Sequence, residues 1–478
     1  MTDSRLAVVV LAAGKGTRMK SDLPKVAHKL AGKAMLHHVL DAIAALDPAK
    51  LVVVVGPDMA LVEDLARPHQ TVVQAPQAGT GHAVLMARDA LAAFQAPGHD
   101  LLVAFGDTPL ITAQTFAALL EARRGPAAPA LVLLGFRPGD PTGYGRIKLD
   151  PERRPVGIVE ERDASDAERR IGLCNGGLML GDAGVMFELL DRVGNDNAKG
   201  EYYLTDIAAL AHAAGYATAV VETSEDEIMG INSRDELAVA EAVMQTRLRG
   251  EAMAAGTTLT DPTTVWLSAD TRFGRDVVVH PNVFFGPGVR VGDRAEIRSF
   301  CHLEGAAIGA DAIIGPFARL RPGTVLGPEA HIGNFVEIKN AVLDQGAKAN
   351  HLAYVGDADI GARANIGAGT ITCNYDGFAK HRTVVGAGAF IGTNTALVAP
   401  VTVGEDAITG AGSVITEDVP ARDLAVTRAR QENINQGAAR YRAKRQNEEG
   451  GAETGTAHNK NAGADRESPS RTAIRQRG

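Results

Sequence analysis

Residues 308–338 read IGADAIIGPFARLRPGTVLGPEAHIGNFVEI, and an aliphatic residue returns there at every sixth position. A step of six residues matches neither the period of an α-helix nor the alternation of a β-strand. Each step predicts instead one flat side of a triangular coil, with its aliphatic residue pointing inward and Gly, Asn or Asp at the corners. We therefore expect a left-handed parallel β-helix of hexapeptide repeats, whose handedness departs from the usual right-handed crossover rule.

The repeat extends well beyond this stretch of the chain. Its expected inward positions are Val279, Phe285, Val291, Ile297, Leu303, Ile308, Ile314, Leu320, Leu326, Ile332, Ile338, Val385, Ile391, Leu397, Val403, Thr409 and Ile415. The register slips between Leu303 and Ile308, and segments 339–359 and 372–384 break the pattern. We expect residues 372–383 to form a loop that leaves the coil.

The N-terminal half of the chain has a different pattern, in which short apolar runs alternate with helical periodicity. The expected strands are 7–11, 51–55, 101–105 and 131–135, and helices are expected at 34–46 and 81–94. Such alternation is typical of βαβ units around a mostly parallel sheet. The sequence therefore predicts a Rossmann-like α/β domain ahead of the coil.

Four parts of the chain follow from these patterns. We expect an α/β domain over 1–232, a linker helix over 233–253, the β-helix over 254–437 and a disordered tail over 438–478. Ser233 and Glu236 have the spacing of a capping box, which predicts the start of the linker helix. The tail is highly polar and has almost nothing to bury, which favours disorder.

Composition excludes several classes of protein. With 45% apolar and 22% charged residues over 478 positions, the chain is expected to be a globular protein of more than one domain. A net charge of −8 argues against nucleic acid as the main partner. Three scattered cysteines predict no disulfide framework, and no signal peptide or membrane span is recognisable. These features predict a cytoplasmic protein without membrane insertion.

A glycine-rich turn follows the first expected strand, where the chain reads LAAGKGTRM over 11–19 and continues to Pro24-Lys25. Glycines after a buried strand allow backbone N–H groups to face a phosphate, and Arg18 and Lys25 add positive charge. The turn is neither a Walker A loop nor a full dinucleotide-binding turn. It closely resembles the signature of sugar-1-phosphate nucleotidyltransferases.

Further motifs of that family follow in order along the chain. The resemblance implies a UTP and sugar-nucleotide site made by Leu11, Ala12, Ala13, Gly14, Lys25, Gln74, Gly79, Thr80, Phe105, Gly106, Asp107, Gly145, Glu160, Asn175 and Asn232. It also implies catalytic roles for Arg18 and Lys25, and Mg²⁺ bound by Asp107 and Asn232. One departure is Asn175-Gly176-Gly177, which has Gly where the family usually carries a small hydroxyl residue.

A hexapeptide coil does not by itself define an activity, since it occurs in acyltransferases, zinc enzymes and oligomerisation scaffolds. Four runs are more specific: RLRPG at 319–323, GNFVEIK at 333–339, HLAYVGD at 351–357 and NIGAGTITCNYDG at 365–377. They resemble the acetyltransferase half of the bifunctional N-acetylglucosamine-1-phosphate uridyltransferase/glucosamine-1-phosphate acetyltransferase family. The combined resemblance covers residues 5–430 or thereabouts.

That family resemblance implies a second site on the coil. His351 matches the family's general base, a task that suits a side chain with a pKa near neutrality. The residues implied for glucosamine 1-phosphate are Arg321, Lys339, Tyr354 and Asn365, and those for acetyl-CoA are Ala368, Asn374, Tyr375, Thr393, Ala411 and Arg428. Thr393 stands where the family often has Ser.

The resemblance implies an order of reactions and an assembly. Acetylation of glucosamine 1-phosphate would precede uridylyl transfer from UTP to N-acetylglucosamine 1-phosphate, in a homotrimer with acetyltransferase sites between subunits. Three alternatives stay open from the residues alone. They are a single-activity nucleotidyltransferase with a scaffold coil, a sugar-nucleotide-binding regulator without turnover, and a zinc hydro-lyase using His280, His302, His331 and His351.

Overall fold

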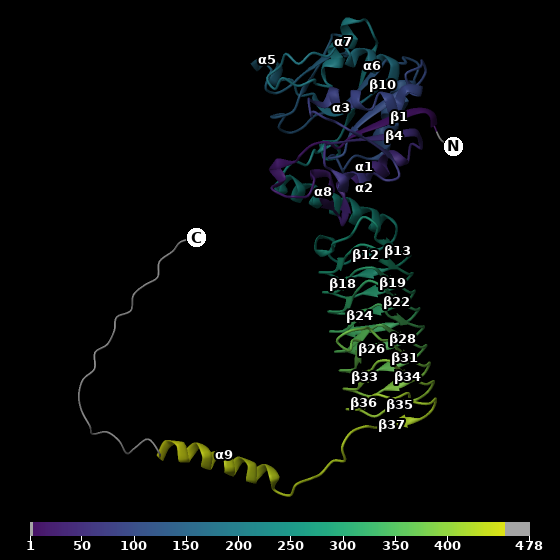
Figure 1. Ribbon diagram of the computed structural model, residues 1–478, viewed down its shortest axis with the longest axis vertical. Helices are drawn as coiled ribbons and strands as arrows, with labels where there is room; N and C mark the ends of the chain where they lie inside the picture. The colour runs from purple at the N-terminus through teal and green to yellow at the C-terminus, as the bar shows by residue number, and fades with distance from the viewer. Residues whose placement is uncertain (1–2, 455–478) are drawn as a thin grey trace, which may run out of the picture. The chain divides into compact units, whose positions relative to one another are not determined.

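The computed structural model describes residues 3–454, in which an α/β domain is followed by a coil of short strands (Figure 1). The main sheet of this part of the chain has the order β11-β7-β10-β6-β1-β4-β5. Its strands are β1 Asp3–Leu11, β4 Pro48–Val55, β5 Gln70–Val73, β6 Asp100–Phe105, β7 Leu131–Phe136, β10 Cys174–Asp182 and β11 Thr218–Thr223. Strand β10 runs antiparallel to β6 and β7, and the other neighbours are parallel. The predicted strands and the mostly parallel sheet are confirmed.

Smaller strands complete this domain. A hairpin of β8 Arg146–Leu149 and β9 Pro155–Val159 attaches to the sheet through β10, and β2 Lys29–Leu30 pairs with β3 Lys33–Ala34. Short 3₁₀ helices lie in the connections, at η1 Thr17–Met19, η2 Lys25–Ala27, η3 Asp89–Phe94 and η4 Glu225–Ile228. The first two belong to the segment that follows β1, where the glycine-rich turn lies.

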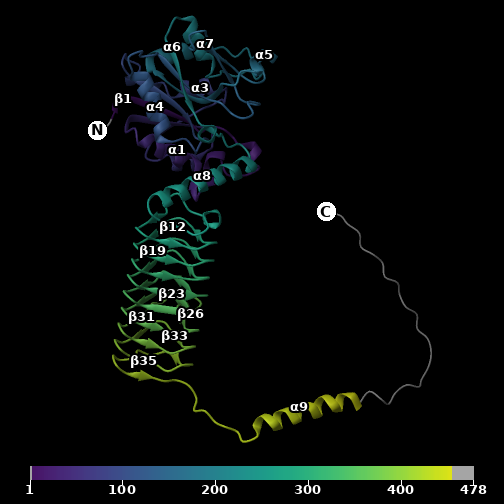
Figure 2. The ribbon, with the colours of Figure 1, turned by 180° about the vertical axis from the view of Figure 1, so that it is seen from behind.

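Helices cover both faces of the sheet, which explains why its central strands are apolar throughout. Along β1, Val8 and Val10 enter one core with α1 Met35–Ala44, α2 Ala60–Ala66 and α4 Ala113–Arg124. Ala7 and Val9 enter the other core with α3 Thr80–Met86, α6 Ala183–Leu190 and α7 Asp206–Ala213. Figure 2 shows α1 and α4 on one side of the domain and α6 and α7 on the other. The short α5 Asp166–Arg169 follows β9.

The helix predicted over 81–94 is wrong in its second half. Helix α3 ends at Met86, and residues Asp89–Phe94 form the 3₁₀ helix η3 with a non-helical backbone at Leu91. The Leu91 side chain is fully buried in the domain core. Tertiary packing of this side chain overrides the helical periodicity of the segment.

Within residues 3–454, the strands of the coil form parallel sheets of ten, eight and eight strands, one on each flat side (Figure 1). The sheet of ten contains β12 Thr258–Leu259, β14 Val278–Val279, β17 Glu296–Ile297, β20 Ile313–Ile314, β23 His331–Asn334, β26 Lys348–His351, β29 Asn365–Ile366, β32 Phe390–Ile391, β35 Ile408–Thr409 and β37 Leu424–Ala425. One sheet of eight contains β13 Arg272–Phe273, β16 Arg290–Val291, β19 Ala306–Ile308, β22 Thr324–Leu326, β25 Val342–Leu343, β28 Ala358–Ile360, β31 Thr383–Val385 and β34 Val401–Val403. The other contains β15 Phe284–Phe285, β18 His302–Leu303, β21 Arg319–Leu320, β24 Glu337–Lys339, β27 Tyr354–Gly356, β30 Ile371–Cys373, β33 Ala396–Val398 and β36 Val414–Ile415.

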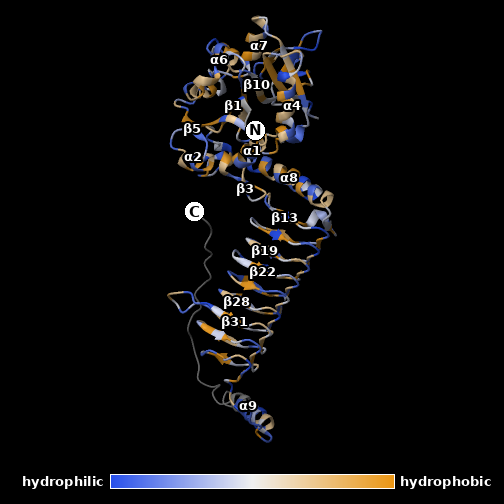
Figure 3. Ribbon diagram, turned by 90° about the vertical axis from the view of Figure 1, so that its right-hand side faces the viewer, coloured by the Kyte–Doolittle hydropathy of each residue, from blue (hydrophilic) through white to orange (hydrophobic). Residues whose placement is uncertain are grey.

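The inward positions predicted from the six-residue step are all buried, and the fold is the expected left-handed β-helix. The expected loop is also present between β30 and β31, where an isolated Tyr375–Lys380 bridge closes an excursion whose tip, Phe378, is 97% exposed. Figure 3 shows this excursion projecting from the coil beside β28 and β31. The 3₁₀ helix η5 Pro262–Thr264 lies in the first turn of the coil.

Two expectations about the coil need correction. Segment 339–359 does not break it, because β25 to β28 continue the three sheets with Leu343, Ala349, Val355 and Ile360 inward. Some steps here have five residues and one inward position is an alanine, so the aliphatic period is hidden rather than lost. Corners are also not confined to Gly, Asn and Asp. Phe300, Phe317, Phe335 and Leu352 occupy corners with positive φ.

A long helix, α8 Arg234–Ala254, follows the α/β domain. The predicted capping box is confirmed, since the Ser233 hydroxyl accepts from the Glu236 N–H and Glu236 accepts from the Ser233 N–H. Ala240 and Met244 pack into an apolar cluster with β2 and α1 residues. Gln245 is buried and exchanges hydrogen bonds of 2.7 and 2.9 Å with the Leu267 backbone.

A second unit of the chain begins at Arg428 and is described by itself. The expectation of a disordered tail from Ala438 is wrong for its first part, because α9 Gly437–Thr454 is helical. Its residues include strong helix formers, and Glu448 forms local ion pairs with Lys444 and Arg445. The rest of the predicted tail, 455–478, lies outside the described residues. None of the helices in the described part of the chain combines the length and hydropathy that a membrane span requires.

Two candidate active sites

A continuous cleft runs across the carboxyl ends of β1 and β6 in the α/β domain. It consists of three adjoining hollows of about 430, 500 and 460 Å³. Phe105, Asp107 and Asn232 line both the first and the second hollow, and Arg18 and Gly143 line both the second and the third. This edge is where open α/β sheets bind ligands.

Most residues predicted for the nucleotidyltransferase site line this cleft. The first hollow contains Leu11, Ala12, Ala13, Gly14, Lys25, Gln74, Gly79, Thr80, Phe105, Asp107 and Asn232; the second adds Arg18 and Asn175, and the third adds Glu160. Gly106 and Gly145 lie directly behind the lining. The Gly106 N–H donates to Leu11 at 2.9 Å, and the Gly145 carbonyl accepts from the Asn175 N–H at 2.8 Å.

The centre of the cleft is a contact among three residues far apart in sequence. The Lys25 ammonium forms an ion pair with Asp107 and donates to Asn232 Oδ1 at 3.1 Å. The Ile231 N–H donates to the Asp107 carbonyl at 2.9 Å. This backbone bond links the segment that carries the Asp107 carboxylate to the segment that carries the Asn232 amide. Side-chain exposure of Lys25 and Asp107 is only 13% and 18%, so their charges lie in a partly dehydrated site.

The glycine-rich turn positions the cations around this centre. Gly16 has φ +62°, and a Cβ there would lie 2.6 Å from Lys25 Cβ. Glycine at this position therefore allows Lys25 to reach the cleft. Arg18 follows in η1 and lines the second and third hollows. The backbone and both cations thus face the same open space, as a polyanionic ligand requires.

The second and third hollows carry the candidate sugar contacts. Glu160 accepts a hydrogen bond of 3.1 Å from Thr205, and its carboxylate lies 3.5 Å from the Cβ position of Gly145. Burial raises the pKa of Glu160 above its ordinary value. Gly177 has φ +85° and lies against the Phe105 ring, with a Cβ position 3.3 Å from the nearest ring carbon. A bulkier residue at 177 would therefore push the ring into the cleft.

Several lining residues had no signal in the sequence. Gln77 lines the first hollow and donates to the Ala13 carbonyl, and Lys199 and Glu201 line both the first and the third hollow. Thr205 lines the third hollow and donates to Glu160. These residues come from irregular loops without periodicity, and only the fold brings them to the cleft.

The second group of predicted residues lies on the coil. Arg321 and Lys339 follow Leu320 and Ile338, which are paired in register between β21 and β24, so the two cations lie side by side on neighbouring strands. The Arg321 guanidinium pairs with Glu337 at 2.8 Å. Lys380, which the sequence analysis did not identify, comes from the loop and lies against Lys339, lowering the pKa of the Lys339 ammonium. A cluster of like charges is a place where a bound phosphate would relieve repulsion.

His351 lies one corner away, at the end of β26. Its Nδ1 is 3.0 Å from Asn334 Oδ1 on the preceding turn of the coil. Because an amide oxygen can only accept, Nδ1 carries the proton in this contact and Nε2 has a free lone pair. The side chain is exposed, as a base that serves a bound substrate must be.

Three of the residues predicted for acetyl-CoA continue in a column below His351. The Gly369 N–H donates to the His351 carbonyl, the Asn394 N–H to Ala368 and the Gly412 N–H to Thr393, at 3.4, 2.7 and 2.8 Å. Ala368, Thr393 and Ala411 therefore occupy the same corner in successive turns. Neighbouring turns lie about 4.8 Å apart, so this strip of small residues extends to about 14 Å from His351.

The remaining predicted residues are less closely grouped. Tyr354 lies on β27, and Asn365 lies on β29, next to the β26 strand that ends at His351. Asn374 is buried and donates to Asp357, so its side chain anchors the start of the loop. Tyr375 is exposed and donates to the Gly377 carbonyl. Arg428 belongs to the second unit, so its role stays a prediction.

Comparison with protein families divides the chain in the same way as the fold. Residues 8–155 match the model of the MobA-like NTP transferase domain. Residues 305–340 and 382–417 match the bacterial transferase hexapeptide family of six repeats. The first match lies within the α/β domain and the second within the coil.

Relatives resemble the whole chain rather than one part of it. The bifunctional protein GlmU of Paramagnetospirillum magneticum is 57% identical over 443 residues, which cover 93% of this chain and 98% of the relative. The proteins of the same name from Rhodospirillum rubrum and Bradyrhizobium sp. (strain ORS 278) are 57% and 55% identical, and the alignments cover 92% of this chain and 98% of each relative.

Proposed function

The chain belongs to the family of bifunctional GlmU proteins, and from this premise we propose how its two sites divide the synthesis of UDP-N-acetylglucosamine. The enzyme acetylates glucosamine 1-phosphate and then transfers a uridylyl group from UTP to N-acetylglucosamine 1-phosphate. We assign the second reaction to the cleft and the first to the coil. The single observation that carries the assignment of uridylyl transfer to the cleft is the convergence of Lys25, Asp107 and Asn232. Asp107 and Asn232 lie 82 and 207 positions after Lys25 in the sequence.

In the cleft, an oxygen of the sugar phosphate attacks the α-phosphorus of UTP, and the bond to the leaving pyrophosphate breaks. Negative charge gathers on the phosphate oxygens, so the protein contributes positioning and positive charge rather than covalent chemistry. Lys25 and Arg18 supply fixed cations, and the turn at 12–16 supplies backbone N–H groups. Glu160 and Asn175, which line the third and second hollows, would orient the sugar.

Mg²⁺ is the cofactor that we propose for this site. Asp107 and Asn232 offer a carboxylate and an amide oxygen to one point, and the Lys25 ammonium already contacts both as a cation would. Few protein oxygens and remaining water ligands are typical of Mg²⁺ sites. Within residues 3–454 no group of three or more His, Cys, Asp or Glu side chains is placed to hold a metal. When bound, Mg²⁺ supplies charge neutralisation at the phosphates.

On the coil, the amine of glucosamine 1-phosphate attacks the thioester carbonyl of acetyl-CoA. His351 Nε2 takes the amine proton, the C–S bond breaks, and the thiolate leaves and is protonated. The contact with Asn334 supports this role, since it holds the imidazole in the tautomer that can accept a proton. Arg321, Lys339 and Lys380 would hold the sugar phosphate, with Tyr354 and Asn365 beside the sugar.

Acetyl-CoA fits the strip formed by Ala368, Thr393 and Ala411. Its reactive thioester would lie next to His351, and the long pantetheine arm would follow the strip along the coil. Small side chains leave room for such an arm, whereas larger ones at these corners would block it. The Asn374 side chain is held by Asp357, so we assign its contribution to the backbone and to placing Tyr375.

We further propose a homotrimer in the cytoplasm. An apolar ladder of Phe300, Phe317, Phe335 and Leu352 is exposed along one corner of the coil, with ring centroids 4.8 and 5.2 Å apart. Exposed patches of this kind mark interfaces. His351 directly precedes Leu352, which supports acetyltransferase sites between subunits. UTP and acetyl-CoA are cytoplasmic metabolites, and all three cysteines are free thiols.

The metal assignment predicts a selective effect of chelation. With UTP and N-acetylglucosamine 1-phosphate, EDTA should stop pyrophosphate release and added Mg²⁺ should restore it, because the phosphate charges lose their counterion. Thiol release from acetyl-CoA with glucosamine 1-phosphate should not change. Pyrophosphate release that continues in EDTA would contradict the proposed metal site.

The cation cluster on the coil predicts a role for Lys380. The variant Lys380→Ala should raise KM for glucosamine 1-phosphate about tenfold, as expected when one charged phosphate contact is lost. Steady-state thiol release measures this effect. KM for UTP in the cleft serves as an internal control and should stay the same. An unchanged KM for glucosamine 1-phosphate would show that Lys380 does not face the phosphate.

A further inference from the structure

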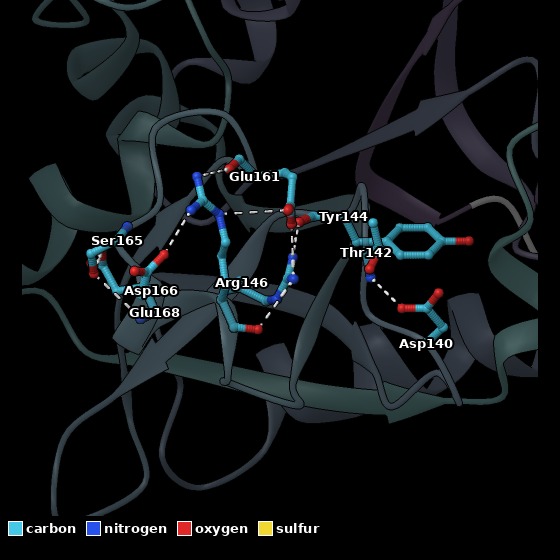
Figure 4. Close-up of polar contacts among 9 residues, drawn as sticks. Asp140, Thr142, Tyr144, Arg146, Glu161, Ser165, Asp166 and Glu168 are labelled. Carbon is cyan, nitrogen blue, oxygen red and sulfur yellow. Dashed lines mark hydrogen bonds and ion pairs between the residues drawn. The ribbon is translucent and has the colours of Figure 1, made fainter.

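Arg146 is the largest fully buried side chain of the described residues, with only 1% of its surface exposed. Arginine is almost never buried to this extent without a partner. Its guanidinium forms an ion pair of 2.8 Å with Glu161 and donates to the Tyr144 carbonyl (Figure 4). It also donates to the Arg169 carbonyl. Arg146 lines none of the three hollows of the cleft, whereas Glu161 lines the third, so the guanidinium of the ion pair lies behind the cleft wall.

The ion pair lies where regular strand pairing stops. In the hairpin of β8 and β9 the last paired residues are Arg146 and Val159. Beyond these residues the two strands continue into separate loops, and the strand pairing does not extend to them. The Arg146–Glu161 ion pair therefore fixes the distance between the two loops at the point where strand pairing has ended.

Both members of the pair are sequence neighbours of candidate sugar contacts. Gly145 precedes Arg146, and Glu160 precedes Glu161. The Glu160 carboxylate lies 3.5 Å from the Cβ position of Gly145, so the two loops meet at this point of the cleft. The Gly145 carbonyl in turn accepts from the Asn175 N–H at 2.8 Å.

The same guanidinium holds a third part of the cleft wall. By donating to the Tyr144 carbonyl, it fixes the residue whose side chain lines the second hollow. The Tyr144 ring packs edge-on against Phe136, with centroids 4.8 Å apart. The Arg146 guanidinium also donates to the Arg169 carbonyl of α5 at 3.3 Å. The Arg169 side chain in turn lies 3.7 Å from the second carboxylate oxygen of Glu161.

We propose that the buried Arg146–Glu161 ion pair is a positioning pair that sets the fit of the sugar in the uridyltransferase cleft. It acts through Gly145, Glu160 and Tyr144 and leaves the UTP end, on β1 and the glycine-rich turn, unaffected. This inference rests on the proposed function of the cleft. A buried ion pair contributes little net stability compared with apolar side chains of similar size, so we assign this pair a geometric role.

The test separates sugar binding from UTP binding by steady-state pyrophosphate release. Arg146→Lys keeps the charge but loses the planar fork that reaches Glu161 and two carbonyls at once. The double variant Arg146→Met/Glu161→Leu removes both charges, so no unpaired buried charge is left to unfold the domain. In both we expect KM for N-acetylglucosamine 1-phosphate to rise ~10–100-fold, as a displacement of about 1 Å produces. KM for UTP should change less than about twofold.

Controls keep the outcomes distinct. Arg154→Met removes an arginine from the exposed Asp150–Arg154 pair at the other end of the same hairpin, and it should behave as wild type. If wild-type enzyme releases no pyrophosphate, the proposed function is wrong. If wild type is active and the double variant keeps the wild-type KM for the sugar, the positioning role is wrong. An equal rise in both KM values would also overturn it, because it would show a general structural role.

Discussion

The variant Asp107→Ala should lose uridylyl transfer by about 10³-fold and keep full acetyltransferase activity. Asp107 holds Lys25 in the cleft and provides one of the two oxygens proposed for Mg²⁺, so its removal weakens charge stabilisation from two sources. The residues from Arg321 to Ala411 that we propose for acetyl transfer lie on the coil, beyond α8. Separate assays of pyrophosphate and free thiol on the same preparation measure both effects.

A matched variant excludes a general effect of removing an aspartate from this domain. Asp64 of α2 forms an exposed ion pair with Arg67, away from the cleft, and Asp64→Ala should change neither activity. Loss of thiol release in Asp107→Ala, in protein that is still folded by circular dichroism, would contradict the division into two independent sites.

The variant His351→Ala should show the reverse pattern. Removal of a general base typically costs about 10²–10⁴-fold in rate, so thiol release should fall to that extent while pyrophosphate release from UTP and N-acetylglucosamine 1-phosphate stays the same. Asn334→Ala should cause a smaller loss, because the imidazole keeps its base but loses the contact that orients it.

The control for this prediction is another exposed histidine of the same coil. His302 stacks on Phe284 with centroids 4.7 Å apart, and His302→Ala should leave thiol release unchanged. Equal losses in His302→Ala and His351→Ala would assign the effect to the stability of the coil rather than to proton transfer. Full activity of His351→Ala would require a different base.

The coil could be predicted from sequence because its period reports burial directly. Every inward position of the six-residue pattern is buried, since a triangular turn has one such position on each side. The same logic failed over 339–359, where five-residue steps and Ala349 interrupt the aliphatic period without interrupting the strands. It also failed at corners such as Phe317, because tolerance of positive φ there depends on stacking with neighbouring turns.

The candidate sites were predictable only where motifs are continuous. The glycine-rich turn and Asp107 follow strands and were identified, and the structure brings them together with Asn232. Lys199 comes from an irregular loop without a pattern, and Lys380 lies in an insertion whose folding back onto Lys339 depends on the three-dimensional path. Such residues can be found only once the fold is known.

Arg146 illustrates a different limit. It directly follows Gly145, which the family resemblance assigns to the sugar-nucleotide site. The structure buries it behind the cleft wall, against Glu161. Burial of a charged side chain depends on a partner from another segment of the fold, which the linear sequence does not specify.

The central claim is that one chain carries out both reactions in order, and one measurement tests it directly. Purified protein is given Mg²⁺, UTP and glucosamine 1-phosphate, with or without acetyl-CoA, and free thiol and pyrophosphate are followed separately. We expect thiol release first, and pyrophosphate only when acetyl-CoA is present. Pyrophosphate release without acetyl-CoA and without any thiol would contradict the ordered pathway and show that the cleft accepts the unacetylated sugar.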